Sequence, residues 1–298
     1  MLNFKEIELE DQEIIQKFLQ EDEFKISDIS FVNLFLWRKA RRIAYAIFRD
    51  CLIIQTTYKN QNPFYFFPIG KGDKLEAIKI LVEFCKARSE VLEFHSLEQT
   101  SVDFLKKFFG EAFIFTLNRD RSDYVYSIEE LISLSGRKYH KKKNHLNRFL
   151  QTYPNFTFER IDEKNTNELL EVWKQWFEIQ ENPSIGLINE NIGIIEVLKN
   201  WGELEVSGGL IRVNNKIIAF SFGEVVSKEM AVIHIEKADS NFHGAYQIIN
   251  QQLLANIFSH IKYANREEDL GIEGLRRAKM SYNPVFLVEK YEASLNQR

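Results

Sequence analysis

Four consecutive charged residues form the densest group of chemically capable side chains in the sequence. They are Arg266, Glu267, Glu268 and Asp269, and they follow Asn265 directly after a predicted strand. Loops at the carboxyl ends of strands in α/β sheets hold ligands. Glu267 and Asp269 could therefore position or deprotonate a cationic amine, and Arg266 could bind an anion. The alternative is a solvated turn, the usual fate of a charge run.

A second pair of candidates alternates with apolar residues along a predicted strand. His234 and Glu236 are two residues apart, so their side chains are expected to face the same side of the sheet. The alternative for Glu236 is a cross-strand pair with a neighbouring lysine. On the last predicted helix, Arg276, Lys279 and Tyr282 are three residues apart. The alternative for Tyr282 is a half-buried aromatic whose hydroxyl bonds to the backbone.

Positive charge is concentrated in one segment of a chain whose net charge is −4. Residues 131–158 contain no Asp or Glu. Their basic side chains are Arg137, Lys138, Lys141, Lys142, Lys143 and Arg148. An acidic protein with one basic segment indicates an anionic partner for that segment.

This basic segment is predicted to form an amphipathic helix. Its apolar stripe comprises Tyr139, Leu146 and Leu150. Its cationic face comprises Lys138, Lys141, His145 and Arg148. Such a face binds a phosphate backbone or an anionic substrate, and a solvated surface helix is the alternative. Without stacked aromatic or base-reading residues, sequence-specific nucleic-acid recognition is not expected.

The loop Asp239–Gly244 precedes a helix predicted from Ala245 and is a further candidate anion site. The unpaired N–H groups and the positive dipole end of a helix bind anions. The candidate contacts are Asn241, His243, Gly244 and Ala245. The alternative is an ordinary connection from strand to helix.

Hydrophobic periodicity predicts the elements that hold these residues. The first half is expected to contain helices at 11–19, 73–88 and 100–109, and strands at 43–48, 51–57, 64–68, 91–94 and 112–117. The second half is expected to contain helices starting at 166, 190, 245 and 271, and strands at 208–213, 217–226, 231–237, 262–264 and 284–291. Hairpin turns are expected at Arg49-Asp50 and Asn214-Asn215, and an N-cap at Asp73.

Length and element order together predict two domains of class α/β (α+β). The chain has 298 residues, 45% of them hydrophobic. In the second half a hairpin leads into a β-α-β unit, which gives a mixed, mostly antiparallel sheet flanked by helices. The first half has a similar order, so we expect tandem domains at residues 1–122 and 123–298, with the basic helix near 137–150 bridging them.

Cysteine usage and hydropathy predict a cytoplasmic protein. Cys51 and Cys85 lie among apolar neighbours, as buried free thiols do in a reducing compartment. No signal peptide or membrane span is visible in the sequence, and contact with a membrane surface stays open. No cluster at metal-ligand spacing is present in the sequence, so no metal is expected.

The order of elements resembles the GNAT fold of acyl-CoA N-acyltransferases. In that fold a loop of pattern Q/R-x-x-G-x-G/A holds the cofactor pyrophosphate at a helix N-terminus. The equivalent loop here runs from Asn241 to Tyr246, and only Gly244 matches the pattern. Asn241 replaces Gln or Arg, and Tyr246 replaces Gly or Ala.

Several stretches also resemble the C-terminal domain of phosphatidylglycerol lysyltransferases. They are Leu134–Phe149, Ala219–Glu224, His234–Ala238, Gly244–Asn250, Asn265–Gly271 and Leu275–Tyr282. The resemblance implies two GNAT domains across a basic helix, passing an aminoacyl group from tRNA to an acceptor. No segment of this sequence resembles the membrane-spanning half of those enzymes, so modification of lipid is not implied.

The resemblance also implies roles for the candidate residues. The strand with His234 and Glu236 would border the acyl donor, so either residue, joined by Glu224, could be the general base. Tyr282 could be the general acid. The expected function is transfer of an acyl or aminoacyl group, from acyl-CoA or aminoacyl-tRNA, to an amine or hydroxyl. The alternative is a non-catalytic module that binds a small anionic ligand or RNA.

Overall fold

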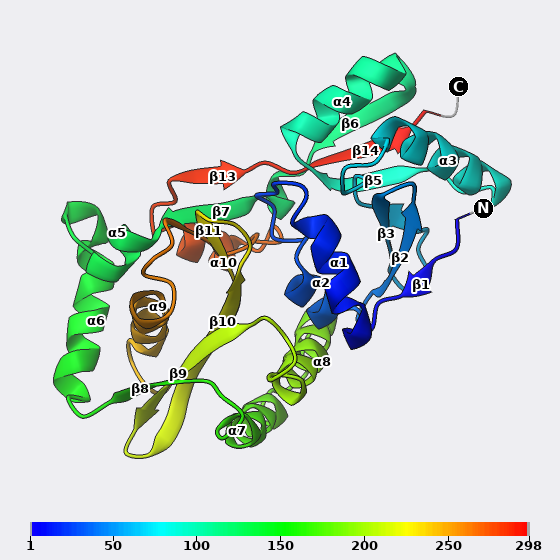
Figure 1. The fold of residues 1–298 in the computed structure, drawn as a ribbon. Helices are drawn as coiled ribbons and strands as arrows, with labels where there is room; N and C mark the ends of the chain where they lie inside the picture. The colour runs from blue at the N-terminus through cyan, green and yellow to red at the C-terminus, as the bar shows by residue number, and fades with distance from the viewer. Residues whose placement is uncertain (1, 297–298) are drawn as a thin grey trace. The chain divides into compact units, whose positions relative to one another are not determined.

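The computed structural model describes residues 2–296 and divides into two compact units (Figure 1). The first unit comprises Met1–Asp123 and Val288–Arg298, and the second comprises Tyr124–Leu287. Each unit contains one mixed sheet flanked by helices, as the expected fold class requires.

The sheet of the first unit is built mostly from antiparallel neighbours. Its strands are β1 (Lys5–Glu6), β2 (Arg42–Phe48), β3 (Cys51–Thr57), β4 (Phe64–Tyr65), β5 (Glu93–Leu97), β6 (Phe113–Leu117) and β14 (Tyr291–Leu295). The spatial order is β1-β2-β3-β4-β5-β14-β6. β4 and β5 are parallel because helix α3 (Lys74–Ala87) crosses between them. β14 therefore brings the end of the chain into the first sheet.

Of the other three helices in the described part of this unit, the first and the third were expected from local signals and the second was not. They are α1 (Gln12–Leu19), α2 (Phe31–Trp37) and α4 (Gln99–Phe109), with single turns η1 (Leu9–Asp11), η2 (Gly110–Ala112) and η3 (Arg119–Arg121). Asp73 caps α3 by accepting the amide of Glu76 at 3.1 Å. The left-handed Arg49 and Asp50 form the β2–β3 hairpin turn. These two predictions are confirmed.

The sheet of the second unit runs in the order β13-β7-β12-β11-β10-β9-β8. Its strands are β7 (Asp123–Ser127), β8 (Thr157–Arg160), β9 (Ser207–Val213), β10 (Lys216–Val225), β11 (Met230–Ala238), β12 (Tyr263–Asn265) and β13 (Phe286–Val288). β11 and β12 are parallel, and the hairpin β9–β10 turns at left-handed Asn214 and Asn215, as predicted.

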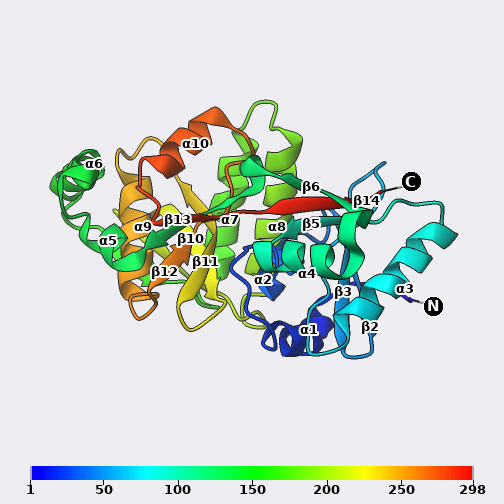
Figure 2. The ribbon, with the colours of Figure 1, turned by 90° about the horizontal axis from the view of Figure 1, so that it is seen from above.

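Helix α9 (Ala245–Asn256) is the crossover between β11 and β12 and packs on one face of this sheet (Figure 2). The helices of the unit are α5 (Ile128–Ser133), the single turn η4 (Arg137–Tyr139), α6 (His140–Thr152), α7 (Thr166–Glu178), α8 (Ile185–Lys199), α9 (Ala245–Asn256) and α10 (Glu273–Met280). The buried residues Ile248, Ile249 and Leu253 of α9 join one core with Leu146 and Phe149 of α6.

Some details differ from the sequence-based expectations. The last eleven residues, Val288–Arg298, belong to the first unit and not to the second, because β14 pairs with β5 and β6. The final strand expected at 284–291 is two strands, β13 and β14. In the basic helix Phe149 is buried and Leu150 is 38% exposed, so the apolar stripe runs through Phe149.

Two further findings concern the cysteines and the apolar character of the helices. Cys51 and Cys85 are free and buried, as expected, and burial raises the pKa of the Cys51 thiol to about 11. None of the helices in residues 2–296 combines the length and apolar character needed to cross a membrane.

Candidate functional site

A polar cluster lies where β11 and β12 reach their carboxyl ends in the second unit. Glu236 on β11 accepts a hydrogen bond from Nη2 of Arg266 at 3.0 Å and another from Nδ2 of Asn250 at 3.0 Å. Arg266 follows β12, and Asn250 lies on the buried face of α9. The β-α-β unit thus brings together residues from a strand, a helix and a loop, as its topology predicts for a ligand site.

Arg266 is the centre of this cluster. Its guanidinium lies 4.8 Å from the ring centroid of Tyr282 and 5.6 Å from that of Tyr126. Burial lowers its pKa, but the carboxylate of Glu236 and the two phenols outweigh burial and raise it. The Nη1 atom is buried and has no hydrogen-bond partner among the described residues. A buried charged donor without a partner is costly, so this atom indicates a place where a ligand oxygen fits.

Tyr282 connects the cluster to the basic helix. Its buried ring lies 4.0 Å from Nζ of Lys142, and its hydroxyl accepts a hydrogen bond from Gln247 at 3.5 Å. Burial raises the pKa of Tyr282, so its hydroxyl keeps its proton at neutral pH. Burial, with the charge of Arg266 nearby, lowers the pKa of Lys142.

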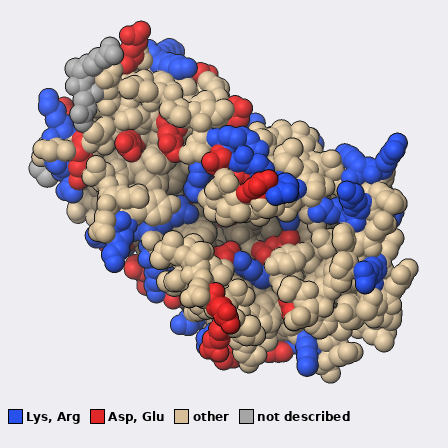
Figure 3. Space-filling model, turned by 180° about the vertical axis from the view of Figure 1, so that it is seen from behind, with Lys and Arg blue, Asp and Glu red and all other residues tan. Residues whose placement is uncertain are grey.

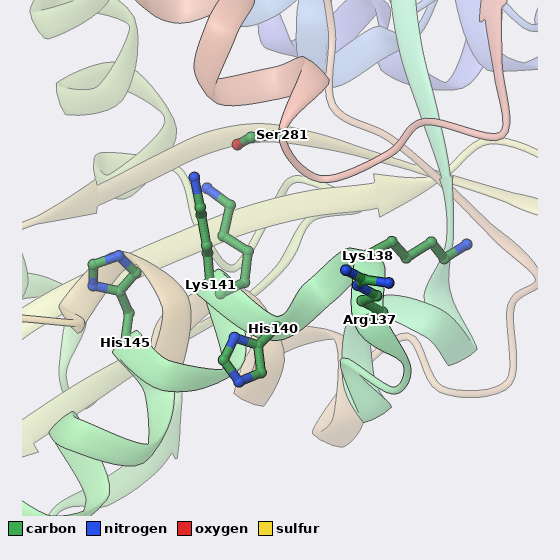
Figure 4. Close-up of a pocket in the computed structure, with 7 residues that line it drawn as sticks. Arg137, Lys138, His140, Lys141, His145 and Ser281 are labelled. Carbon is green, nitrogen blue, oxygen red and sulfur yellow. The ribbon is translucent and has the colours of Figure 1, made fainter.

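A cationic cavity of about 620 Å³ opens beside Lys142 (Figure 4). Its lining residues are Arg137, Lys138, His140, Lys141, Lys142, His145 and Ser281. In Figure 4, Lys141 extends from α6 towards Ser281, whereas Lys138 turns away. Lys138 is bonded to Glu130 at 2.8 Å. The acidic and basic side chains on the face shown in Figure 3 are interspersed, whereas this lining contains no acidic residue.

His234 lies in a β-bulge of β11 and is almost fully buried. The register between β10 and β11 shifts at Phe222/Gly223, which leaves His234 as the extra residue. Its Nε2 lies 2.8 Å from Glu224 and its Nδ1 lies 2.8 Å from Glu267. Burial disfavours the charged ring, but these two carboxylates outweigh burial and raise the pKa of His234 to about 9. His234 is therefore an imidazolium at neutral pH, which has no lone pair to accept a proton.

Asp269 anchors the loop that follows β12. Its buried carboxylate accepts hydrogen bonds from Nε (2.9 Å) and Nη2 (2.8 Å) of Arg276. It also accepts hydrogen bonds from the Tyr124 hydroxyl and the amide of Gly271. Burial raises its pKa, but these donors outweigh burial and hold the pKa well below its usual range. This carboxylate is a structural anchor and a poor base.

Glu267 has the left-handed backbone that the turn after β12 requires, with φ of 57°. Its amide bonds to the buried side chain of Asn265 at 2.8 Å. Its carbonyl oxygen accepts a hydrogen bond from Nζ of Lys279 at 3.1 Å. Hydrogen bonds and not solvent thus hold the 265–269 loop, in contrast to a solvated turn.

The Gly244 loop packs tightly against α6. Gly244 has a φ of 88°, and a Cβ there would lie 2.7 Å from the carbonyl oxygen of His145 and 2.9 Å from Cβ of Phe149. The amide of Ala245 bonds to the carbonyl of Phe242 at 3.0 Å. Glycine is thus required for close packing of the loop on α6. A helix carbonyl beside the loop also disfavours an anion at Gly244, which is the position of the pyrophosphate in the acyl-CoA pattern.

The remaining predicted contacts are spread over the surface of the second unit. His243 is exposed, and its Nε2 atom lies 2.9 Å from Nδ1 of His145. Asn241 is exposed and bonds to Asp239. Arg148 is exposed on α6 and does not line the cavity.

Sequence reasoning missed Asn250 and Gln247 as parts of the cluster. Asn250 is 2% exposed among the apolar side chains of α9. A polar residue on the buried face of an amphipathic helix needs a partner, and this was the signal that could have identified it. Gln247 lies one turn before Gln251 on a helix rich in amides, and nothing in the sequence singles it out.

The fold is that of the tandem GNAT-like proteins. One such protein, from the clavulanic acid biosynthesis pathway, superposes with a TM-score of 0.51 at 8% identity over 100% of both chains. Residues 23–294 match the family described as phosphatidylglycerol lysyltransferase, C-terminal. The chain belongs to this family.

Individual proteins are also similar to this chain. A conserved protein of unknown function from Bacteroides thetaiotaomicron has a TM-score of 0.92 at 35% identity, over 99% of this chain and 100% of that one. The L-PGS from Bacillus licheniformis has a TM-score of 0.67 at 17% identity, over 97% and 93%. An uncharacterised protein of Mycoplasmoides gallisepticum is 24% identical over 59% of this chain, and the match spans only 56% of that curated relative.

Proposed function

We propose that this protein transfers an aminoacyl group from aminoacyl-tRNA to an amine or hydroxyl acceptor. The observation that carries the proposal is the contact between Lys142 and Tyr282, which joins the cationic cavity to the polar cluster. Membership of the lysyltransferase family supports aminoacyl transfer in general.

The cationic cavity is the proposed site for the phosphates of the donor. Lys141, Lys142 and Arg137 supply positive charge without an acidic residue in the lining. Lys and Arg side chains bind nucleic-acid phosphates with little regard to sequence. An acyl-CoA donor fits less well, because α6 packs against the loop that would hold its pyrophosphate.

Glu236 is the proposed proton acceptor. Asp269 is saturated by its donors, and Glu267 is bonded to the charged His234. Each oxygen of Glu236 accepts one hydrogen bond, from Arg266 or Asn250, and keeps a second lone pair. Tyr282 is the proposed proton donor, because its raised pKa keeps the phenol protonated.

The proposed step is an aminolysis when the acceptor is an amine and a transesterification when the acceptor is a hydroxyl. The acceptor nitrogen or oxygen attacks the ester carbonyl carbon of the donor and forms the new C–N or C–O bond. Its proton passes to Glu236. The bond from the carbonyl carbon to the ribose oxygen breaks, and Tyr282 protonates that oxygen. Nη1 of Arg266 lies in the same cluster and can stabilise the negative oxygen that develops.

The matched experiment measures binding of a mixture of aminoacylated tRNAs to the full chain at increasing salt. We expect binding to weaken steeply with salt and to be lost in Lys141→Glu/Lys142→Glu, because the cavity charge is reversed. Lys216→Glu/Lys228→Glu makes the same charge change at exposed positions outside the cavity lining and should bind much more like the wild type.

A second measurement separates transfer from binding alone. Labelled aminoacyl-tRNA is incubated with the protein and a panel of small amines, and loss of the ester label is followed. Amine-dependent loss that Glu236→Gln slows supports transfer. Binding of tRNA without such loss supports the alternative, an RNA-binding module. Stabilisation by acyl-CoA, with no response to tRNA, would overturn the donor assignment.

A further inference from the structure

A second cavity, of about 150 Å³, is lined by residues of the first unit. Its walls include Phe64 of β4, His95 and Ser96 of β5, and Tyr58. It therefore adjoins the parallel pair β4–β5, as the polar cluster of the second unit adjoins the parallel pair β11–β12. Its volume equals that of about five water molecules in the liquid, which suits a small metabolite.

The backbone is distorted at this cavity. The pairing of β14 with β5 shifts register between Tyr291 and Ala293, so that β5 contains a bulge at His95 and Ser96. Ser96 has a φ of 55°, which a residue with a Cβ adopts only at a cost. Bulges and such strain occur at functional sites, where they aim side chains. Here both distorted residues line the cavity.

Charges of both signs meet in the same walls. Asp28 is buried and paired with the buried Lys290 and with Arg121, whose Nη2 lies 3.3 Å away. Arg121 retains 25% exposure of its side chain. Glu292 retains 38% and accepts a hydrogen bond from Nδ2 of Asn118 at 2.6 Å. The cavity thus offers a guanidinium and a carboxylate that solvent can reach, beside aromatic surface.

We propose that this cavity binds a free α-amino acid as its zwitterion. The guanidinium of Arg121 would receive the α-carboxylate, since its N–H groups match the geometry of a carboxylate. Glu292 would accept the α-ammonium group. Phe64, whose ring stacks on His95 at 4.0 Å, and Tyr58 would contact the side chain. Neither a simple amine nor a simple carboxylic acid satisfies both charges. The inference does not depend on the proposed transfer reaction.

The test is calorimetric titration of the full chain with the common L-amino acids, one at a time. For the amino acid that binds best, the matched amine without the carboxylate and the matched acid without the amine are titrated next. We expect both to bind about tenfold or more weakly, because the amine offers no carboxylate to Arg121 and the acid offers no ammonium group to Glu292. The proposal is overturned by the absence of binding for every amino acid, or by equal binding of the amine or the acid.

Variants of the lining residues test whether the amino acid binds in this cavity. Glu292→Gln keeps the shape of the side chain and the acceptor for Asn118, and should weaken binding about tenfold. Arg121→Lys keeps the charge, loses the planar fork and should also weaken binding. Glu111→Gln, at an exposed position outside the cavity, is the matched control. Unchanged binding in a folded Glu292→Gln, judged by its thermal unfolding, would refute the site.

A last variant separates this site from the proposed donor site. Lys142→Gln changes the cationic cavity of the second unit and should leave amino-acid binding unchanged. Loss of amino-acid binding in Lys142→Gln, with retention in Glu292→Gln, would move the amino acid to the second unit and overturn the inference. If Lys142→Gln loses tRNA binding but keeps amino-acid binding, the result bears on the proposed function and leaves the amino-acid site in place.

Discussion

Nε2 of His234 lies 2.8 Å from Oε1 of Glu224 within the sheet of the second unit. The two groups form an ion pair at neutral pH, because the carboxylates beside the buried ring hold the pKa of His234 at about 9. In the sequence, the alternation of His234 with apolar residues suggests a base. In the structure His234 is a cation that links β11 to β10 and to the loop after β12.

Stability should therefore fall with pH in a defined window. The raised pKa means that the folded state binds the proton more tightly than the unfolded state does, so the contribution is complete below about pH 6.5 and is lost as pH rises through about 9. The loss is on the order of 3 kcal/mol. Urea unfolding at several pH values measures it. His234→Gln should flatten this slope, whereas exposed His260→Gln should not.

Gly244→Ala should destabilise the protein by about 1–3 kcal/mol. The new Cβ would meet the carbonyl of His145 at 2.7 Å, and the φ of 88° is unfavourable for alanine. Gly274→Ala on α10 is the matched control. Its Cβ meets nothing within 4 Å, so stability should stay unchanged or rise by up to about 1 kcal/mol. Equal unfolding midpoints for the two variants would contradict the close packing of the loop on α6.

Asp269→Asn should cost about 2–4 kcal/mol of stability. It removes the buried charge that holds Arg276, Tyr124 and Gly271. Glu273→Gln breaks an ion pair with Arg277 whose side chains are 80% and 74% exposed, and should change stability by less than about 0.5 kcal/mol. Chemical denaturation compares the two. A small effect of Asp269→Asn would show that this carboxylate is not the anchor of the loop.

Tyr282→Phe should lower the rate of aminoacyl transfer by about 10²–10⁴-fold, because the variant has no phenolic proton to give to the leaving oxygen. Binding of tRNA should persist, since the ring beside Lys142 remains. Tyr263→Phe, on β12 away from the cluster, should leave the rate unchanged. Single-turnover kinetics separate the two steps. A normal rate in Tyr282→Phe would remove this residue from the chemistry.

Much of the fold could be predicted because its signals are local. The N-cap at Asp73 and the turns at Arg49-Asp50 and Asn214-Asn215 depend on neighbours a few residues apart. Helix α2 shows no alternation of apolar and polar faces, because its one polar residue, Asn33, is buried with all the others but Trp37, and the sequence did not predict this helix. β5 was expected two residues too early, because its bulge at His95–Ser96 depends on pairing with β14.

The sequence placed the charged run directly after a strand, which is where β12 ends, but the partners of the candidate residues were not predictable. The charged run after β12 indicated a site, yet nothing in it distinguished Asp269, which is saturated by Arg276, from Glu267, which faces His234. Partners in a cluster are chosen by packing of distant segments.

The sequence by itself determined most of the helices and strands, the basic segment at 131–158, the buried free cysteines and the glycine at the turn into α9. These follow from backbone preferences, periodicity and charge, which act over a few residues. The tertiary structure alone decided that β14 completes the first sheet, that Lys142 meets Tyr282 and that His234 is charged. Each of these depends on burial and on pairing between residues far apart in the chain, because a side chain's charge and partners are set by what surrounds it.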